Sequence, residues 1–352
     1  MGKESFILFG VLNWGLGHAT RSIPIIGALR EQGFTPVLAS DGEALQYLKT
    51  TFPDLPSAEL PSYNIHYSRY NFTGAMLQQL PKIARTVKAE KAQAGELVEQ
   101  YRPKGIISDN RLGFFSKEVP AVYITHQLKI RMPLVGPVAS WVHRYFIKKY
   151  HECWVPDLED EKNSLGGELS HIGPTDFPVR YIGPLSQLGK TVSHEKQYDA
   201  VVLMSGPEPQ RSLLEKRIIR QLEKMEGRFF LVRGSTKAAP LETQIPHASL
   251  LTGAEIAELI HTSGLVISRS GYSSIMDYYF MGNKALLVPT PGQVEQGYLA
   301  TYLRGKGIFY SVRQKDMNLR YDISEALTFP GLAEPHERIS SWPELFNLFK
   351  GK

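Results

Sequence analysis

The sequence contains a single cysteine, Cys153, so it has no disulfide framework and no zinc or iron–sulfur site built from cysteines. It also lacks a long apolar run, because the uncharged stretch 133–142 is about half of a membrane span and contains two prolines. The short apolar run near the start stops at glycines and has no signal-peptide cleavage pattern. We therefore expect a cytoplasmic protein without a transmembrane segment.

The composition is that of a folded protein with little charge bias. The chain has 352 residues, of which 42% are hydrophobic and 21% are charged, and this excludes intrinsic disorder and collagen-like sequence. The formal net charge of +5 is not gathered in a tail of the kind that binds nucleic acid. The length suits two domains of about 150 to 200 residues each.

Apolar strands alternate with helical patterns along the chain, and this order begins twice. The first series has strands at 6–11, 35–39, 105–108, 121–125, 153–155 and 180–182, with helices over 19–31 and between 76 and 101. The second has strands at 199–205, 229–233, 248–251, 265–268 and 285–288, with helices ending near 225 and at 255–262, 274–281 and 295–304. The pattern predicts an α/β fold of two doubly wound, Rossmann-like domains that face each other across a cleft.

We place the N-terminal domain at 1–185 and the C-terminal domain at 190–334. A polar segment with glycine and proline, 183–193, is the expected linker between them. Residues 335–352 predict one more helix, which could dock on either domain.

A glycine-bearing loop joins the first strand to the first helix and carries a histidine. Gly15 and Gly17 allow a tight turn and a close approach to the helix N-terminus, where free N–H groups favour anions. As a dinucleotide fingerprint the loop is partial, because Thr20 stands at the third glycine position, although Asp41 could serve a ribose. His18 opens the helix at the mouth of the cleft and is a candidate base; the alternative is a capping or packing histidine.

Polar residues follow the next two strands of the first series. Asp109 could orient His18 and stabilise its imidazolium, or it could be an ordinary helix cap or turn residue. His126 and Gln127 come after the following strand and would line the same wall of the cleft.

Two loops in the second half carry hydroxyl, amide and carboxylate groups at helix starts. In the first, Ser268-Arg269-Ser270-Gly271 would present donors to phosphate oxygens, and Asp277 lies about 9 Å further along the helix, where it could hold ribose hydroxyls. In the second, Gln293, Glu295 and Gln296 offer groups for the hydroxyls of a sugar. The alternative for both loops is ordinary capping chemistry.

These motifs resemble the nucleotide-sugar site of inverting glycosyltransferases of the two-Rossmann (GT-B) type. The resemblance is to the MurG group, the bacterial N-acetylglucosaminyltransferases acting on a lipid-linked peptidoglycan precursor, and to the diacylglycerol galactosyltransferases. We expect it to cover the whole chain, with its specific motifs in the C-terminal half. The stretch Thr125-His126-Gln127-Leu128 departs from the His-Glu-Gln-Asn of that group, which implies a different acceptor pocket.

The resemblance implies a role for each matching position. Asp277 would hold the ribose, Glu295 and Gln296 the donor sugar, and His18 with Asp109 would form the base and its support. Arg211 or Arg269 would supply positive charge to the diphosphate, and Pro207-Glu208-Pro209 replaces the small residues that the group has in its phosphate loop. The diphosphate would lie against the remaining matched positions: Ser205, Gly206, Ser268, Ser270 and Gly271.

The function implied is metal-independent, inverting transfer of a hexose or N-acetylhexosamine from a nucleotide sugar to a hydroxyl acceptor. We expect no cofactor, a UDP-linked donor as co-substrate, and an acceptor that is lipid-linked or part of a cell-envelope glycan. No Asp-x-Asp motif is present, which fits a design without a metal. The alternatives are a nucleotide-sugar 2-epimerase, an NAD(P)-dependent oxidoreductase, and a non-catalytic sugar-nucleotide-binding subunit of a two-component transferase.

One stretch is strongly basic. Residues 82–150 contain thirteen Lys and Arg against five Asp and Glu, and the basic residues flank the apolar segment 133–142. The stretch could be a solvated helix face, or it could dock on the anionic inner face of a membrane and bring the site to a membrane-borne acceptor.

Overall fold

A computed structural model describes residues 5–64, 72–133, 135–188, 195–235, 240–332 and 341–351 of the chain, with side chains from residue 78 onward in the helix that begins at 72. Two compact units make up the chain: an N-terminal unit, Met1–Leu185 together with Glu337–Lys352, and a C-terminal unit, Ser186–His336. Part of the expected linker 183–193 lies outside the described residues, as do the expected domain start at 190 and helix start at 335.

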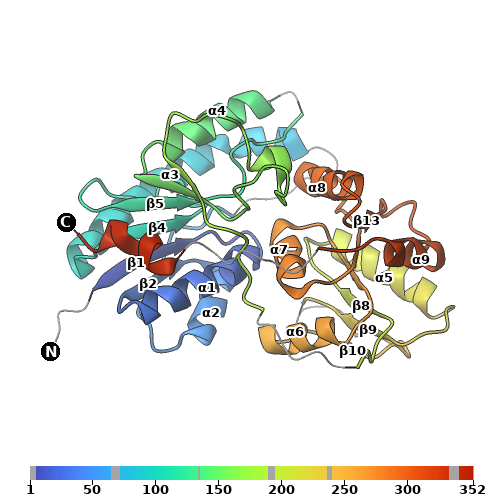
Figure 1. Cartoon of the computed structure of the whole chain (residues 1–352). Helices are drawn as coiled ribbons and strands as arrows, with labels where there is room; N and C mark the ends of the chain where they lie inside the picture. The colour runs from blue at the N-terminus through green and yellow to red at the C-terminus, as the bar shows by residue number, and fades with distance from the viewer. Residues whose placement is uncertain are drawn as a thin grey trace. The chain divides into compact units, whose positions relative to one another are not determined.

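The N-terminal unit is built on a parallel seven-stranded sheet (Figure 1). Its strand order is β3-β2-β1-β4-β5-β6-β7, so the order reverses between β1 and β4 as in Rossmann folds. The strands are β1 (Phe6–Val11), β2 (Thr35–Ser40), β3 (Ser57–Glu59), β4 (Gly105–Asp109), β5 (Ala121–Ile124), β6 (Glu152–Val155) and β7 (Val179–Tyr181). Ligand-binding loops are expected at the carboxyl ends of β1 and β4, where the order reverses.

Helices cover both faces of this sheet. Helices α1 (Gly17–Glu31) and α2 (Gly42–Thr51) lie on one face, and α3 (Phe72–Tyr101) and α4 (Gly136–Ile147) lie on the other (Figure 1). The core on the second face joins β-strand residues to apolar residues of α3 and to Ile147 of α4. Although α3 is 30 residues long, no helix in the described ranges is long and apolar enough to cross a membrane.

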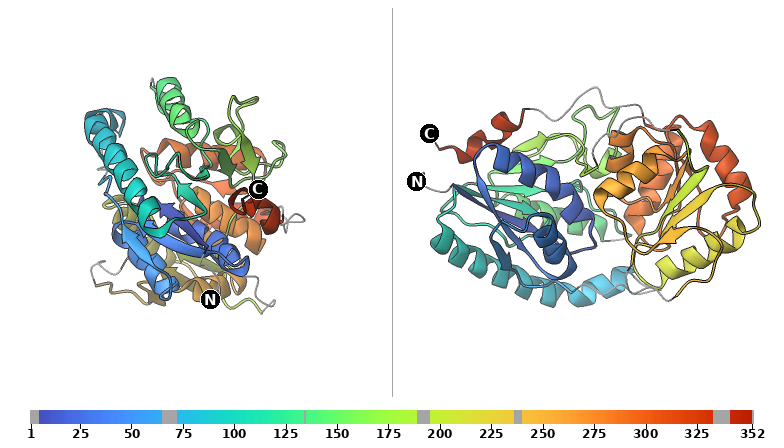
Figure 2. Two further views of the ribbon diagram at one scale, coloured as in Figure 1. Left: turned by 90° about the vertical axis from the view of Figure 1, so that its left-hand side faces the viewer. Right: turned by 90° about the horizontal axis from the view of Figure 1, so that it is seen from below.

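The C-terminal end of the chain packs on the N-terminal unit. The sequence had not indicated on which of the two domains it would dock. Residues 342–349 form helix α10 (Trp342–Leu345) and a 3-10 turn (Phe346–Phe349). The ring of Phe346 contacts those of Phe34 and Trp154, and Phe349 lies against Trp154 and Gly105. Figure 2 shows this end of the chain, in red, packed against the N-terminal unit.

The C-terminal unit has a parallel six-stranded sheet of order β10-β9-β8-β11-β12-β13. The strands are β8 (Ala200–Leu203), β9 (Phe229–Val232), β10 (His247–Ala248), β11 (Val266–Ser268), β12 (Ala285–Leu287) and β13 (Tyr310–Ser311). Its helices are α5 (Gln210–Leu222), α6 (Gly253–His261), α7 (Tyr272–Met281), α8 (Val294–Gly305) and α9 (Leu319–Thr328). The core on one face gathers apolar residues of α5 and α9 against the strands. The two sheets confirm the predicted class of two Rossmann-like domains.

The sequence did not indicate β3, β13, α2, α4 or α9. The two strands are three and two residues long, too short to show a period. Helix α4 begins with Gly136 and Pro137, and two prolines near an apolar run favour an irregular segment; here Pro137 occupies the first turn, where its missing N–H costs nothing.

Candidate active site

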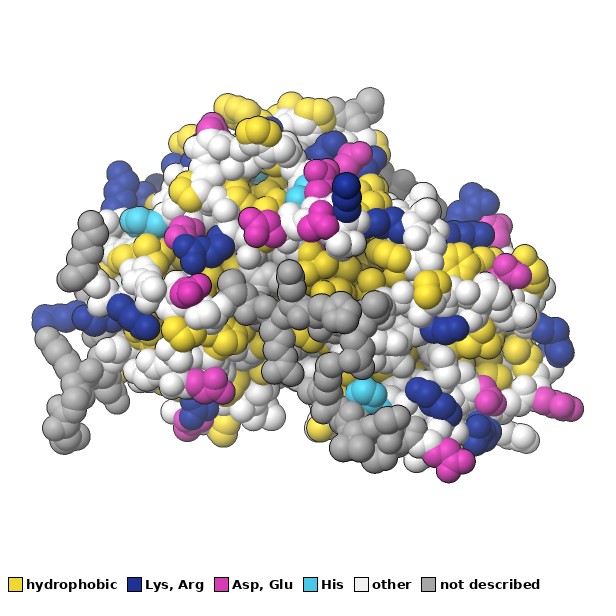
Figure 3. Space-filling model, in the orientation of Figure 1, with side chains coloured by type: hydrophobic (Ala, Val, Ile, Leu, Met, Phe, Trp, Pro, Cys, Tyr) yellow, Lys and Arg dark blue, Asp and Glu magenta, His cyan; other side chains and the backbone are white. Residues whose placement is uncertain are grey.

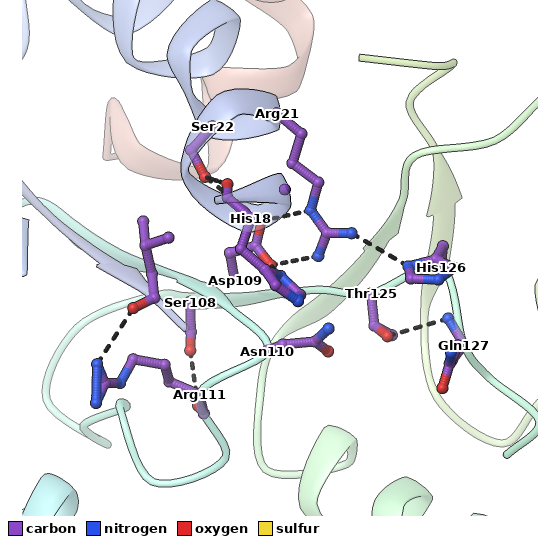
Figure 4. Close-up of polar contacts among 12 residues, drawn as sticks. His18, Arg21, Ser22, Ser108, Asp109, Asn110, Arg111, Thr125, His126 and Gln127 are labelled. Carbon is purple, nitrogen blue, oxygen red and sulfur yellow. Dashed lines mark hydrogen bonds and ion pairs between the residues drawn. The ribbon is translucent and has the colours of Figure 1, made fainter. Parts of the chain in front are cut away.

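The loop after β1 brings His18 to the carboxylate that ends β4. Gly15 adopts a φ of 73°, which a glycine tolerates, and α1 begins at Gly17. Strands β1 and β4 are neighbours, with Val11 opposite Asp109, so the loop and the carboxylate leave the sheet at the same edge. His18 Nδ1 lies 2.7 Å from Asp109 Oδ1 (Figure 4).

A second group grips the same carboxylate, and the sequence did not point to it. Arg21 follows His18 by one helical turn and is buried. Its Nε donates to Asp109 Oδ2 at 2.7 Å, and its Nη2 donates to Oδ1. Asp109 is therefore shared between an imidazole and a guanidinium, both from the first helix.

The residues after β5 complete this polar cluster. His126 Nδ1 lies 3.1 Å from Arg21 Nη1, and the N–H of Gln127 donates to the hydroxyl of Thr125 at 3.1 Å. The stick view shows His18, Arg21, Asp109 and His126 gathered around one end of the sheet (Figure 4). The structure thus places His126 beside the predicted pair, as the strand order requires.

Burial and the neighbouring charges shift the pKa values of Asp109 and His18. Burial alone would raise the pKa of Asp109, but the Arg21 charge and the contacts with His18 outweigh it and hold that pKa well below its ordinary value. Burial, and after it the charge of Arg21, lowers the pKa of His18, while Asp109 acts against them. At neutral pH, Asp109 is ionised and His18 is neutral, which is the form a base requires.

The ribose role considered for Asp41 is wrong. Asp41 is buried, and its two oxygens are taken by Arg111 Nη1 at 3.0 Å and Asn13 Nδ2 at 3.1 Å. A carboxylate held this way is a structural anchor for the loop after β1. Nothing in this arrangement supports a dinucleotide site.

In the C-terminal unit, the loop after β8 lies over two buried polar atoms without partners. Ser205 and Gly206 are exposed, and Gly206 has a φ of 97°. A methyl group on Gly206 would be 3.5 Å from Thr290 Oγ1 and 3.9 Å from Arg269 Nε. Within the described part of the chain, neither of these two atoms has a hydrogen-bond partner. An unused N–H and an unused hydroxyl beside a glycine loop are what an anion site requires.

Most of the Arg269 guanidinium is nevertheless used by the protein. Its Nη1 donates to the carbonyls of Val288 and Pro289 and to Gln314 Oε1, and its Nη2 donates to the carbonyl of Gln210. These contacts fasten the loops after β8 and β12 together. Burial lowers the pKa of Arg269 to about 10, so it stays charged at neutral pH.

Two of the predicted diphosphate ligands turn inward, which corrects that prediction. The hydroxyl of Ser268 donates to the carbonyl of Arg269 at 2.9 Å and accepts from the Tyr278 hydroxyl at 2.7 Å. The hydroxyl of Ser270 donates to the carbonyl of Gln296 at 2.8 Å. Both serines are buried, so their side chains brace the loop, and the partly buried backbone at Gly271, the N-cap of α7, remains as the accessible part of the motif.

Arg211 is also committed elsewhere, which corrects the expectation that it supplies positive charge to phosphates. It is buried and pairs with Glu208 through Nε at 2.8 Å and with Glu215 through Nη1 at 3.4 Å. The same Nη1 donates to the carbonyl of Arg233 at 3.0 Å. Glu208 therefore neutralises the guanidinium before any ligand arrives, and Glu215 is shared with Arg233.

The predicted ribose and sugar ligands lie on α7 and α8. Asp277 lies on α7 and accepts a 2.5 Å hydrogen bond from Ser186 Oγ, and burial raises the pKa of Asp277 to about 7. At the start of α8, Gln296 Oε1 accepts from the N–H of Thr290 at 2.8 Å, so this amide holds the loop after β12. Gln293 is the N-cap of α8 and Glu295 lies in its first turn, and both are partly buried.

No group of three or more His, Cys, Asp or Glu within the described ranges is arranged to hold a metal ion.

Comparisons with known proteins agree with the fold. Residues 210–335 match the glycosyltransferase family 28 C-terminal domain. The chain is 27% identical over 320 residues to the UDP-N-acetylglucosamine--N-acetylmuramyl-(pentapeptide) pyrophosphoryl-undecaprenol N-acetylglucosamine transferase of Sulfurihydrogenibium sp. (strain YO3AOP1), covering 86% of this chain and 83% of that protein.

Solved structures show the same two-domain architecture. MurG of Acinetobacter baumannii has a TM-score of 0.61 at 11% identity and covers 98% of this chain, which in turn covers 99% of it. A UDP-glucosyltransferase from Polygonum tinctorium has a TM-score of 0.64 at 13% identity, with 99% of both chains covered. The fold and these matches define the chain as a two-domain GT-B glycosyltransferase. Within that class the chain is similar to the N-acetylglucosamine transferase of Sulfurihydrogenibium and to MurG.

Proposed function

We propose that the chain transfers a hexose or N-acetylhexosamine from a nucleotide sugar, UDP-linked, to a hydroxyl group of a lipid-linked or cell-envelope acceptor, with inversion at the anomeric carbon and without a metal. The observation that carries this proposal is the pair His18–Asp109, in which a neutral imidazole is held through Nδ1 by an ionised carboxylate. The UDP-linked donor and lipid-linked acceptor are supported by the activity after which the Sulfurihydrogenibium relative is named.

The N-terminal unit supplies the base. With Nδ1 donating to Asp109, the lone pair of His18 is on Nε2, and no described residue forms a hydrogen bond to that atom in the structure. Nε2 takes the proton of the acceptor hydroxyl as its oxygen bonds to the anomeric carbon, and the bond from that carbon to the diphosphate breaks on the opposite face. The electron pair leaves with the diphosphate.

The C-terminal unit holds the donor. The diphosphate lies over Gly206 and Gly271, where the N-terminal ends of α5 and α7 and the unused N–H of Arg269 face it. These fixed dipoles stabilise the charge that develops as the diphosphate departs. Asp277 accepts from the ribose hydroxyls, and the first turn of α8 with Glu295 and Gln296 binds the sugar.

The base is tested by replacing His18 with glutamine and measuring donor binding and turnover separately. General-base removal costs about 10²–10⁴-fold in turnover, and donor affinity should stay within a few-fold of wild type. His247→Gln is the matched control, because His247 is an exposed histidine of the C-terminal unit. Turnover in His18→Gln within a few-fold of wild type would refute the base assignment. A thermal-shift panel of UDP-, dTDP- and GDP-sugars identifies the donor, and sugar conversion by donor alone would indicate an epimerase instead.

A membrane surface is part of the proposal, and helix α4 supports it. Val138, Trp141, Val142 and Tyr145 recur at helical spacing, and all four are exposed, Trp141 by 65% and Tyr145 by 53%. Hydrophobic side chains gather over α4 at the upper edge of the molecule (Figure 3). Exposed tryptophan and tyrosine on one helix face are typical of a helix that lies in the lipid headgroup region.

The basic residues around α4 are less available than the sequence indicates. Lys129 and Arg131 pair with Glu168, and Lys148 pairs with Asp176. Lys149 lies over the Tyr145 ring, 4.3 Å from its centroid. The apolar stripe of α4 therefore carries the docking proposal, and attraction to anionic lipid adds to it.

Co-sedimentation with vesicles of phosphatidylglycerol and phosphatidylcholine tests this surface. We expect wild type to bind, and Trp141→Ser combined with Tyr145→Ser to lose most of the binding while nucleotide affinity is retained. Tyr321→Ser, which removes a 56% exposed tyrosine of α9, is the control and should bind like wild type. Equal binding of the double variant and wild type would remove the proposal.

A further inference from the structure

Arg21 lies between one carboxylate and two imidazoles, and it is 4% exposed. Its Nε and Nη2 hold the two oxygens of Asp109, and its Nη1 lies 3.1 Å from His126 Nδ1. His18 shares Oδ1 of the same carboxylate. The charged groups that face His18 thus come from α1, from the end of β4 and from the segment after β5.

The hydrogen bonds of Arg21 dictate where the ring protons are. A guanidinium can only donate, so Nδ1 of His126 accepts and that neutral ring carries its proton on Nε2. An ionised carboxylate can only accept, so Nδ1 of His18 carries a proton and its Nε2 carries a lone pair. The two histidines are therefore in opposite tautomers.

The charge of Arg21 also limits protonation of the His18 ring. The site holds one buried anion, Asp109, and Arg21 already occupies both of its oxygens. A proton on His18 would place a second positive charge against the same carboxylate. In a His–Asp pair without the arginine, the carboxylate would instead favour the imidazolium.

The geometry points to Arg21 as a positioning residue that fixes the two histidines in opposite neutral tautomers and keeps His18 unprotonated in mildly acidic solution. This inference rests on the proposed function for its consequence, because an unprotonated His18 is the active base. The consequence is a transferase whose kcat/KM for the acceptor, measured at saturating donor, holds steady as the pH falls through 6.5. The base is correspondingly weaker than a free imidazole, since a lowered pKa means a lower proton affinity.

Nuclear magnetic resonance of the ¹⁵N-histidine-labelled protein reads these states directly, without substrate. The chain has ten histidines, and the signals of His18 and His126 are assigned by their absence from His18→Gln and His126→Gln. In wild type we expect His18 protonated on Nδ1, His126 protonated on Nε2, and a His18 titration midpoint below 6.5. A wild-type midpoint above 6.5, or the same tautomer in both rings, would overturn the inference.

Variants separate the charge of Arg21 from its bulk. Arg21→Met should move the His18 midpoint upward by about one unit or more, because Asp109 then acts on the imidazole alone. The acid limb of kcat/KM should move with it, about a tenfold loss at a fixed pH on that limb for each unit. Arg21→Lys keeps the charge and should leave the midpoint below 6.5. If Arg21→Lys shifts the midpoint as far as Arg21→Met, charge is not the cause.

Arg30→Met is the matched control, because it removes one positive charge from the same helix. Arg30 pairs with the exposed Asp54, away from the cluster. Its His18 midpoint should equal that of wild type, and a shift as large as that of Arg21→Met would overturn the inference. Because the titration needs no substrate, it stands even where transfer fails: a shifted midpoint with unaltered turnover in His18→Gln would refute the proposed base and leave the role of Arg21 intact.

Discussion

Replacing Arg111 with methionine tests a charge network that lies inside the N-terminal unit. Arg111 is fully buried, and its Nε donates to Glu90 Oε1 at 2.5 Å while Nη1 donates to Asp41 Oδ1 at 3.0 Å. The network joins α3 to the loops after β2 and β4, and through Asp41 it reaches Asn13 in the loop that leads to His18. The substitution leaves two carboxylates in the interior without their cation.

The expected loss is large on the scale of a domain's stability. Breaking a buried ion pair by removing one partner costs about 3–5 kcal/mol, against a total free energy of unfolding of about 5–15 kcal/mol. Glu90 also accepts from the Tyr63 hydroxyl at 2.6 Å and from the N–H of Gly113 at 3.0 Å, and burial raises its pKa. Arg111→Met combined with Glu90→Gln should recover part of the loss, because one of the two unpaired charges is then absent.

Urea unfolding followed by tryptophan fluorescence measures the stability lost by the N-terminal unit. The four tryptophans, Trp14, Trp141, Trp154 and Trp342, all belong to the N-terminal unit. Arg30→Met is the control, since its exposed pair with Asp54 should contribute less than about 1 kcal/mol. A loss below about 1 kcal/mol in Arg111→Met, or a double variant no more stable than the single one, would refute the reasoning.

Three further predictions follow from groups elsewhere in the two units. Burial lowers the pKa of His143 to about 4 from 6.5, so the unfolded chain binds a proton that the native chain does not; stability should fall by about 2–3 kcal/mol between pH 7 and 4.5, and His143→Gln should remove that part in denaturation curves. Gly105→Ala would place a methyl 2.2 Å from the Phe349 ring and 2.9 Å from the carbonyl of Pro120, and should cost about 1–3 kcal/mol in urea unfolding. Adding it to Phe349→Ala should cost less than this, because only the contact with the carbonyl then remains. Burial raises the pKa of Asp277 to about 7, and ribose hydroxyls prefer the ionised form, so calorimetry should show the affinity for a UDP-sugar rising with pH between 6 and 8. Asp277→Asn should abolish that rise, and an unchanged slope in the variant would exclude Asp277 from the ribose site.

The pairing of His18 with Asp109 could be anticipated because it depends on strand order alone. Both follow buried strands, and in a doubly wound sheet the first and fourth strands are neighbours whose carboxyl ends meet. The contact of Arg21 with Asp109 could not be anticipated in this way. An arginine on a first helix is usually solvated, and only the position of Asp109 makes the inner side of α1 a favourable place for it.

The direction of side chains explains the errors in the C-terminal unit. A serine at a strand end can point to a ligand or to the core, and Ser268 points inward because Tyr278, on the following helix, offers its hydroxyl. Arg211 is different, since Glu215 follows it by four residues on α5 and is therefore within reach of its side chain, while Glu208 reaches it from the loop just before the helix. That pattern is visible in the sequence and would have predicted a neutralised arginine.

If His18 is the base of an inverting transfer, the configuration of the first-formed product reveals it. Proton nuclear magnetic resonance follows the anomeric signal when wild type or His18→Gln is given an α-linked UDP-sugar with a panel of hydroxyl acceptors, water included. The account predicts that wild type forms the β-anomer first and that His18→Gln forms it at least about 10²-fold more slowly. A product that first appears as the α-anomer, or an equal rate in His18→Gln, would contradict it.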